Sequence, residues 1–379
     1  MSLCITGMGW VTPLGSGVDA VWERLLHGDE AVPSSMAGPF GKKSYNAFRV
    51  PDDALVDLPA HPRLRRASAI SRFAVAAGLG ALANARSTID GEMARRTALV
   101  FAVSNGGVTY TKRFYHDIVA TGASAASPLL FPETVFNAPA SHLAAVLGLT
   151  GASYTLVGDG AVGTLAIQMA EDLMADDAID QCLVVGAEEA DWVLCDAYSK
   201  WRLLRPDPPI EPFRKPPRGT ILSEGAGALL FGREGKIAIK AINPGGNFSQ
   251  QKNAARWTAK VLSELMGEQP TDLIISAANG SFIDDAESTA FAQSACKATI
   301  YSPKPALGES VGASGIWQVI AGAQALLTQQ VPPLLHGPGK AAATPHTAIT
   351  KEAVVLDCGL NQQIAGLRLT VKAENHPST

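Results

Sequence analysis

Short apolar runs alternate along the chain with longer stretches whose apolar residues recur at helical spacing. The short runs are rich in Val, Ile and Leu, and turn residues close several of them, a pattern typical of buried strands. The longer stretches predict helices with one apolar face. Strands that alternate with helices indicate α/β layering, a fold in which helices cover a sheet. We expect strands at 3–9, 97–104, 181–188, 227–232, 272–280 and 353–359, and helices at 73–85, 140–149, 163–175 and 315–327.

Two pairs of segments resemble each other weakly. TALVFAVSNGG at 97–107 is matched by DLIISAANGS at 272–281, each an apolar run closed by an Asn-Gly turn. DGAVGTLAIQMA at 159–170 is matched by ESVGASGIWQVIAG at 309–322, each a turn of small residues before an apolar helix. The repeats predict two similar halves that meet near 232–240, which we assign to residues 1–232 and 233–379.

Three segments are not expected to form regular elements. RPDPPIEPFRKPPRG at 205–219 is a surface loop, because each Pro lacks an N–H donor and restricts the residue before it. HGPGKAAATPH at 336–346 is a second loop, and the tail ENHPST at 374–379 has no periodic pattern.

Composition excludes several classes of partner. The 379 residues, 47% of them hydrophobic, can bury a large core. A formal net charge of -4 and a pI near 6.0, with no Lys/Arg-rich block, argue against nucleic acid or an anionic membrane as a partner. The N-terminus lacks the pattern of a signal peptide, and no apolar run is long enough to span a bilayer. We therefore expect a cytoplasmic protein.

The cysteines and histidines indicate neither a disulfide framework nor a metal site. The five Cys form no CxxC pair and no Cys/His ligand spacing, so reduced thiols and no metal or cofactor are expected.

The stretch YTLVGDGAVGTLAIQMAEDL at 154–173 predicts a buried strand, a sharp turn and a helix. Such a turn presents a side chain at a helix N-terminus, where the helix dipole favours an anion such as a thiolate. Here, however, the turn is Gly-Asp-Gly, so it carries no nucleophile.

Four segments taken together resemble the elongating β-ketoacyl synthases, in order and over nearly the whole chain. The resemblance implies the thiolase fold, in which two similar halves form five layers, αβαβα, and a strand beside the active site forms a dimer. The segments are TGMGWVTPLGSGVDAVWERLLHG at 6–28, FNAPASHLAAVLGLTGASYTL at 136–156, EPFRKPPRGTILSEGAGALLF at 211–231 and SPKPALGESVGASGI at 302–316.

That family uses a Cys nucleophile and two His, and the resemblance places other residues at all three positions. Gly160 stands at the Cys, Asn279 at the first His and Glu309 at the second. A glycine cannot carry an acyl group, and an ionised Glu would repel an enolate. The family's aromatic, glycine-rich gate is also changed, because Leu360 stands at the aromatic position of DCGLNQQIAG, 357–366.

Other residues near the expected site have two interpretations each. Lys304 matches a family active-site lysine and could equally be an ion-pair partner of Glu309. Glu224 matches a family carboxylate that braces the site, or it is a buried structural partner, which we favour. Asp159 is a helix cap or a partner of the helix dipole, or else a general base, and Cys358 is a packed thiol or a recruited nucleophile.

The resemblance favours a non-catalytic subunit of the chain-length factor type, which pairs with an active ketosynthase and shapes its acyl tunnel in polyketide, aryl-polyene or fatty-acid-like biosynthesis. It implies the ketosynthase, an acyl carrier protein and an acyl chain as partners. A homodimeric hydrolase or acyltransferase with a remodelled pocket is the alternative, and a stand-alone acyl-binding or carrier-binding module is a third. Candidates for the tunnel or the interface are Leu130, Phe131, Thr134, Phe136 and Leu360.

Overall fold

One large mixed sheet runs through the molecule, and the same strand order occurs in it twice. The computed structural model describes residues 3–38, 41–267, 271–294, 296–338, 346–347 and 350–372. Within these residues the sheet order is β11-β10-β14-β15-β9-β1-β8-β7-β5-β6, and the short β2 (Gly15–Ser16) pairs with β1. The first half supplies β1 (Leu3–Thr12), β5 (Thr97–Val103), β6 (Ser153–Val157), β7 (Gln181–Glu188) and β8 (Gly225–Gly232). The second half supplies β9 (Ile237–Asn247), β10 (Leu273–Ile275), β11 (Thr299–Tyr301), β14 (Glu352–Cys358) and β15 (Gln363–Val371).

The pairing pattern is the same in both halves. In the first half β5 lies parallel to β6 and β7, and β8 runs antiparallel to β7 and β1. In the second half β10 lies parallel to β11 and β14, and β15 runs antiparallel to β14 and β9. The two repeated sequence segments therefore contribute β5 and β10, which hold equivalent places. The halves join where Leu3 of β1 pairs with Ile239 of β9; the division after residue 232 stays a prediction.

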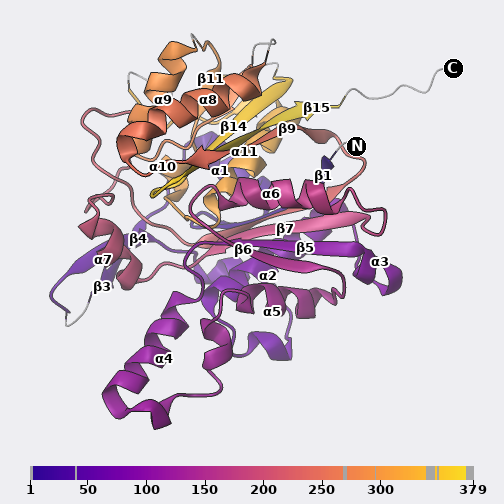
Figure 1. Cartoon of the computed structure of the whole chain (residues 1–379), viewed down its shortest axis with the longest axis vertical. Helices are drawn as coiled ribbons and strands as arrows, with labels where there is room; N and C mark the ends of the chain where they lie inside the picture. The colour runs from indigo at the N-terminus through magenta and orange to yellow at the C-terminus, as the bar shows by residue number, and fades with distance from the viewer. Residues whose placement is uncertain are drawn as a thin grey trace.

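Five layers, αβαβα, are visible in Figure 1, so the expected fold class is confirmed. The strands of the two halves form the two β layers. The outer helices are α8 (Ala254–Met266) and α9 (Phe282–Gln293) on one side, and α2 (Ala69–Ala85) and α5 (Ala138–Leu147) on the other. The middle layer holds α6 (Val162–Leu173) and α11 (Ser314–Thr328), the helices of the second repeated pair.

Small residues allow the close approaches in this arrangement. A Cβ atom on Gly163 of α6 would lie 3.2 Å from the Cα of Gly315 in α11, so the two middle helices contact through their glycines. A Cβ atom on Gly9 of β1 would lie 1.9 Å from the carbonyl oxygen of Ala77 in α2. The first contact holds the N-terminal turns of α6 and α11 together, and the second packs α2 closely on β1.

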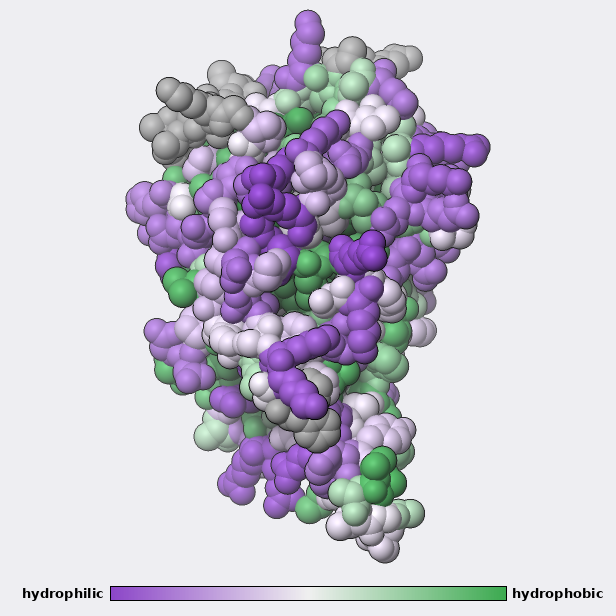
Figure 2. All heavy atoms as spheres, turned by 90° about the vertical axis from the view of Figure 1, so that its left-hand side faces the viewer, coloured by the Kyte–Doolittle hydropathy of each residue, from purple (hydrophilic) through white to green (hydrophobic). Residues whose placement is uncertain are grey.

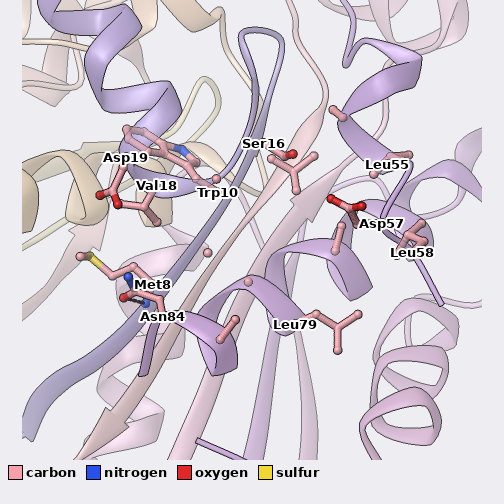
Figure 3. Close-up of a pocket in the computed structure, with 17 residues that line it drawn as sticks. Met8, Trp10, Ser16, Val18, Asp19, Leu55, Asp57, Leu58, Leu79 and Asn84 are labelled. Carbon is pink, nitrogen blue, oxygen red and sulfur yellow. Dashed lines mark hydrogen bonds between the residues drawn. The ribbon is translucent and has the colours of Figure 1, made fainter. Parts of the chain in front are cut away.

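Smaller elements surround the layers. On the left of Figure 1 lie α7 (Trp192–Lys200) and a hairpin of β3 (Pro33–Ala37) and β4 (Ser44–Phe48). Below them α4 (Val108–Thr121) projects away from the layers, followed by the short turn η5 (Phe131–Thr134). In Figure 2 this lower end carries green residues on one side and purple residues on the other. The remaining α-helices among the described residues are α1 (Val18–His27), α3 (Gly91–Arg96) and α10 (Lys304–Leu307). Two short strands, β12 (Gln330–Val331) and β13 (His346–Thr347), pair with each other.

The irregular segments were predicted in part. Residues 205–219 contain no helix or strand of the described chain. The expected loop at 336–346 lies partly outside the described residues, and the tail at 374–379 lies wholly outside them. No helix in the described part of the chain combines the length and the apolar character that a membrane span requires.

Candidate functional site

The Gly-Asp-Gly turn lies between β6 and α6 and faces the tip of the hairpin formed by β14 and β15. Gly160 is buried there. A Cβ atom on Gly160 would lie 3.0 Å from the Cα of Gly359 and 3.2 Å from the carbonyl oxygen of Cys358. The hairpin tip therefore occupies the space beside position 160, and any side chain there would press against it.

Asp159 does not cap the following helix. The N-cap of α6 is Ala161, which makes no side-chain capping bond. The Oδ2 atom of Asp159 instead accepts hydrogen bonds from the backbone N–H groups of Asn361 and Gln362, each at 2.9 Å. The cap interpretation is wrong because the hairpin tip offers two N–H donors to the buried carboxylate.

The strand before the turn is not buried, contrary to the sequence prediction. β6 is the last strand of the sheet and pairs with β5 on one side. Tyr154 and Val157 are 44% and 53% exposed. The prediction failed because an apolar run indicates a strand but does not show whether other elements of the chain pack around that strand.

The residues that the resemblance places at the two histidine positions, Asn279 and Glu309, contact each other directly. Asn279 follows β10, and its side-chain N–H donates to the Oε2 atom of Glu309 at 2.6 Å. The Lys304 ammonium at the start of α10 donates to the same oxygen at 2.8 Å. Lys304 and Glu309 are each 2% exposed and Asn279 is fully buried. Of the two interpretations of Lys304, the structure therefore displays the ion pair with Glu309.

The electrostatics around this pair are dominated by buried carboxyl groups. Burial alone would lower the pKa of Lys304, but the charges of Glu309 and Asp357 outweigh it and raise that pKa. Burial raises the pKa of Asp357 to about 7 and that of Glu287 to about 7. Asp284 accepts from the backbone N–H of Asn279 at 2.9 Å, and burial raises its pKa to about 6. Near neutral pH several of these acids are therefore partly protonated, which moderates the buried negative charge.

A second group of acids lies at the end of β7. Glu188 accepts from the backbone N–H groups of Ser104 and Asn105, and burial raises its pKa to about 8. Glu224 accepts from the backbone N–H of Ala190 and pairs with Arg49 at 3.0 Å. Glu224 thus holds neighbouring loops together through backbone and ion-pair contacts.

The sequence analysis missed Glu188, Asp284, Glu287 and Asp357. For Glu188 and Asp357 a signal was present, since each acid lies near the end of an apolar strand run.

Neither Gly160 nor Cys358 offers a reactive nucleophile for acyl transfer. Gly160 has none, and Cys358 is buried with its thiol donating to the carbonyl of Gly359. Burial raises the pKa of the Cys358 thiol well above its usual value, which suppresses the reactive thiolate. The Oδ1 atom of Asn279 is also occupied, since it accepts from the backbone N–H and the hydroxyl of Ser281.

The tunnel candidates fall into two places. Leu130, Phe131, Thr134 and Phe136 lie in and beside η5, where Phe131 and Phe136 are exposed and Leu130 and Thr134 are partly exposed. The ring of Phe136 covers Gly106, whose Cβ position lies 2.9 Å from a ring carbon. Leu360 lies elsewhere, packed in the core formed with α8, α9 and β14, so the structure separates it from the η5 group.

Comparisons with known proteins agree with this fold. The chain matches the family profile "Beta-ketoacyl synthase, N-terminal domain" over residues 2–236 and the corresponding C-terminal domain over 247–337. It is 25% identical to the 3-oxoacyl-[acyl-carrier-protein] synthase 2 of Vibrio harveyi over 236 residues, which are 60% of this chain and 56% of that protein. It is 26% identical to the nodulation protein E of Rhizobium leguminosarum bv. trifolii over 60% of this chain and 57% of the relative. The chain thus spans little more than half the length of these relatives, whereas its 26% identity with the synthase 2 of Rhizobium meliloti extends over 92% and 93% of the two chains.

Solved structures share the fold over nearly the full length. The ishigamide ketosynthase/chain length factor aligns with a TM-score of 0.84 at 20% identity, covering 98% of this chain and 99% of the other. A ketosynthase in complex with its chain length factor from Xenorhabdus doucetiae aligns with a TM-score of 0.80 at 18% identity, covering 98% of each chain. At these identities the likeness shows the fold alone. Because the family profile matches well over half of the sequence, the chain belongs to the β-ketoacyl synthase family.

Proposed function

We propose that this chain is a non-catalytic ketosynthase subunit of the chain-length factor type, which pairs with an active β-ketoacyl synthase and shapes its acyl tunnel. The observation that carries the proposal is the buried contact of Lys304, Glu309 and Asn279 beside a glycine at position 160. This contact satisfies the groups of the former site with one another, so they stabilise the subunit. In this proposal the nucleophile belongs to the partner.

The uncovered edge of the sheet supports a partner subunit. β6 carries no charged residue, and its sequence SYTLV presents unpaired backbone groups on one side. Exposed edge strands without charged residues promote association with another chain, so proteins usually protect them. We propose that the active ketosynthase covers β6 and that an acyl carrier protein delivers the acyl chain to the pair.

Co-expression with an intact ketosynthase tests the pairing. The two chains are expected to co-purify as a one-to-one complex in size-exclusion chromatography with mass determination. Val157→Lys places a charge on the exposed face of the edge strand and is expected to abolish the complex. Val56→Lys is the matched control, because Val56 is 72% exposed and follows the short turn η2 (Asp52–Leu55), which contacts β2 and α2. A complex that forms equally well with Val157→Lys contradicts the proposal, as does ketoacyl product made by the purified chain alone.

The exposed residues of η5 provide the test of the tunnel. In the assembled pair we expect Phe136→Ala to shift the length of the product while the partner's thiol is acylated at its normal rate. Val119→Ala is the control, since Val119 is 85% exposed on α4. Unchanged product length with Phe136→Ala, or an equal shift with the control, contradicts the assignment of Phe136 to the tunnel.

A further inference from the structure

The tip of the β14–β15 hairpin closes over the glycine turn. Residues 359–362 connect the two strands, and the backbone N–H of Gly359 donates to the carbonyl of Gln363 at 2.7 Å. The carbonyl of Gln362 accepts from the backbone N–H of Phe248 at 2.6 Å. The tip is thus a short, hydrogen-bonded turn whose first residue lies against position 160.

The side chain of Asp159 binds this tip. Its Oδ2 atom accepts two backbone N–H groups from the tip, and the carboxylate is almost completely buried. Hydrogen bonds to a charged acceptor are among the stronger ones in proteins. The Oδ1 atom is buried without a hydrogen-bond partner in the described residues, so the carboxylate is aimed at the tip and makes no such bond elsewhere.

The hairpin tip is shaped to receive that carboxylate. A Cβ atom on Gly359 would lie 1.9 Å from the Oδ2 atom of Asp159, which no real pair of atoms tolerates. Gly359 does not have the positive φ that would itself require glycine. The glycine is therefore needed at position 359 because the Asp159 side chain occupies the space of a Cβ atom.

We infer that Asp159 is a latch that keeps the hairpin tip 359–362 shut over position 160, so that this subunit's own former pocket is closed. In the closed state the tip fills the space that an acyl thioester at position 160 would need. If the proposed function holds, an acyl group delivered by a carrier protein can reach only the partner's site. The latch itself depends only on contacts within this chain.

Hydrogen exchange on the isolated chain tests the latch. Asp159→Ala removes both hydrogen bonds to the tip and is expected to speed exchange of the Asn361 and Gln362 amides at least about tenfold, which corresponds to about 1.4 kcal/mol. Cys358, buried beside the tip, should react faster with a maleimide, while the fully buried Cys182 in β7 stays unlabelled. Asp191→Ala is the matched control, because Asp191 also accepts a backbone N–H but lies at the start of α7. This control should leave exchange in the tip unchanged.

A second pair of variants tests the steric half of the inference. Gly359→Ala should open the tip when Asp159 is present, because the new methyl group collides with the carboxylate. In the Asp159→Ala background the same substitution should add little. Should Asp159→Ala fail to fold, Gly359→Ala alone must still speed exchange of the two amides.

Two results overturn the latch: unchanged exchange and Cys358 labelling in Asp159→Ala, or an effect of Gly359→Ala that is equal in both backgrounds. Neither readout involves a ketosynthase. The latch can therefore fail while the pairing proposal stands, and failure of the pairing leaves the exchange result intact.

Discussion

Breaking the buried pair of Lys304 and Glu309 should destabilise the protein far more than breaking an exposed pair. The two charged atoms lie 2.8 Å apart and both side chains are 2% exposed. At an effective dielectric constant of about 20, charges at this distance attract by about 6 kcal/mol, and the cost of removing both from water offsets part of that. Removal of one partner leaves an uncompensated buried charge, which costs about 3–5 kcal/mol. We therefore expect Lys304→Met and Glu309→Leu each to lower the free energy of unfolding by about that amount.

The double substitution should cost less than the two single ones together. With both charges removed, the remaining penalty is the Asn279 amide, which loses its acceptor at a cost of about 1–3 kcal/mol. The difference between the double variant and the sum of the single variants should thus exceed about 2 kcal/mol.

Urea unfolding at pH 7 measures these values, with an unchanged slope against urea as the check on comparable unfolding. Lys200→Met is the matched control, since Lys200 pairs with Asp196 at 2.6 Å but its side chain is 70% exposed. The control should change the free energy by less than about 1 kcal/mol. A loss for Lys304→Met no larger than that of the control, or strictly additive losses, would refute the reasoning.

Two further predictions concern the same region. Burial raises the pKa of Asp357 from 3.8 to about 7. Between these two values the folded state keeps a proton that the unfolded chain releases. The free energy of unfolding therefore falls as pH rises from about 4 through 7. Asp357→Asn should therefore raise the melting temperature more at pH 8 than at pH 5, and an equal shift at both pH values would contradict this. Gly160→Cys should not restore condensation, because Asn279 and Glu309 supply neither histidine and the Cβ atom meets Gly359. Ketoacyl product from this variant, purified without a partner, would show that the pocket is competent.

The repeated segments made the fold predictable. β5 and β10 are continuous apolar runs, and the small residues that open α6 and α11 reflect the contact between those helices. Elements without a continuous apolar pattern were missed. In α4 only Phe114 is buried, so its sequence carries no clear apolar stripe. β9 begins with apolar residues but ends in Pro-Gly-Gly-Asn, which is typical of a loop.

The sequence indicated which segments form the candidate site, but it did not reveal the contacts between their side chains. The motif resemblance directs attention to Gly160, Asn279 and Glu309, and their assignment to the catalytic positions stays a prediction. The contacts of Asp159 with the tip at 361–362 could not be predicted, since they join residues that are 202 and 203 positions apart in the sequence. The same holds for Asp357, whose raised pKa follows from complete burial, a property of the assembled layers.

The contacts within the site also determine how substitution of Cys and His at positions 160, 279 and 309 would affect the stability of the fold. Glu309→His removes the oxygen that accepts hydrogen bonds from both Lys304 and Asn279. The Lys304 ammonium then stays buried without the carboxylate that neutralises it. The triple variant Gly160→Cys, Asn279→His, Glu309→His should therefore melt at a lower temperature than Gly160→Cys alone, because the single variant leaves the ion pair intact. Adding Lys304→Met to the triple variant should recover part of that loss, although it removes a residue that the family's active site contains. A triple variant as stable as Gly160→Cys would mean that Lys304 does not depend on Glu309. If the expected order is found, the former active site has become part of the structural core, and its chemistry cannot be restored without a compensating change at Lys304.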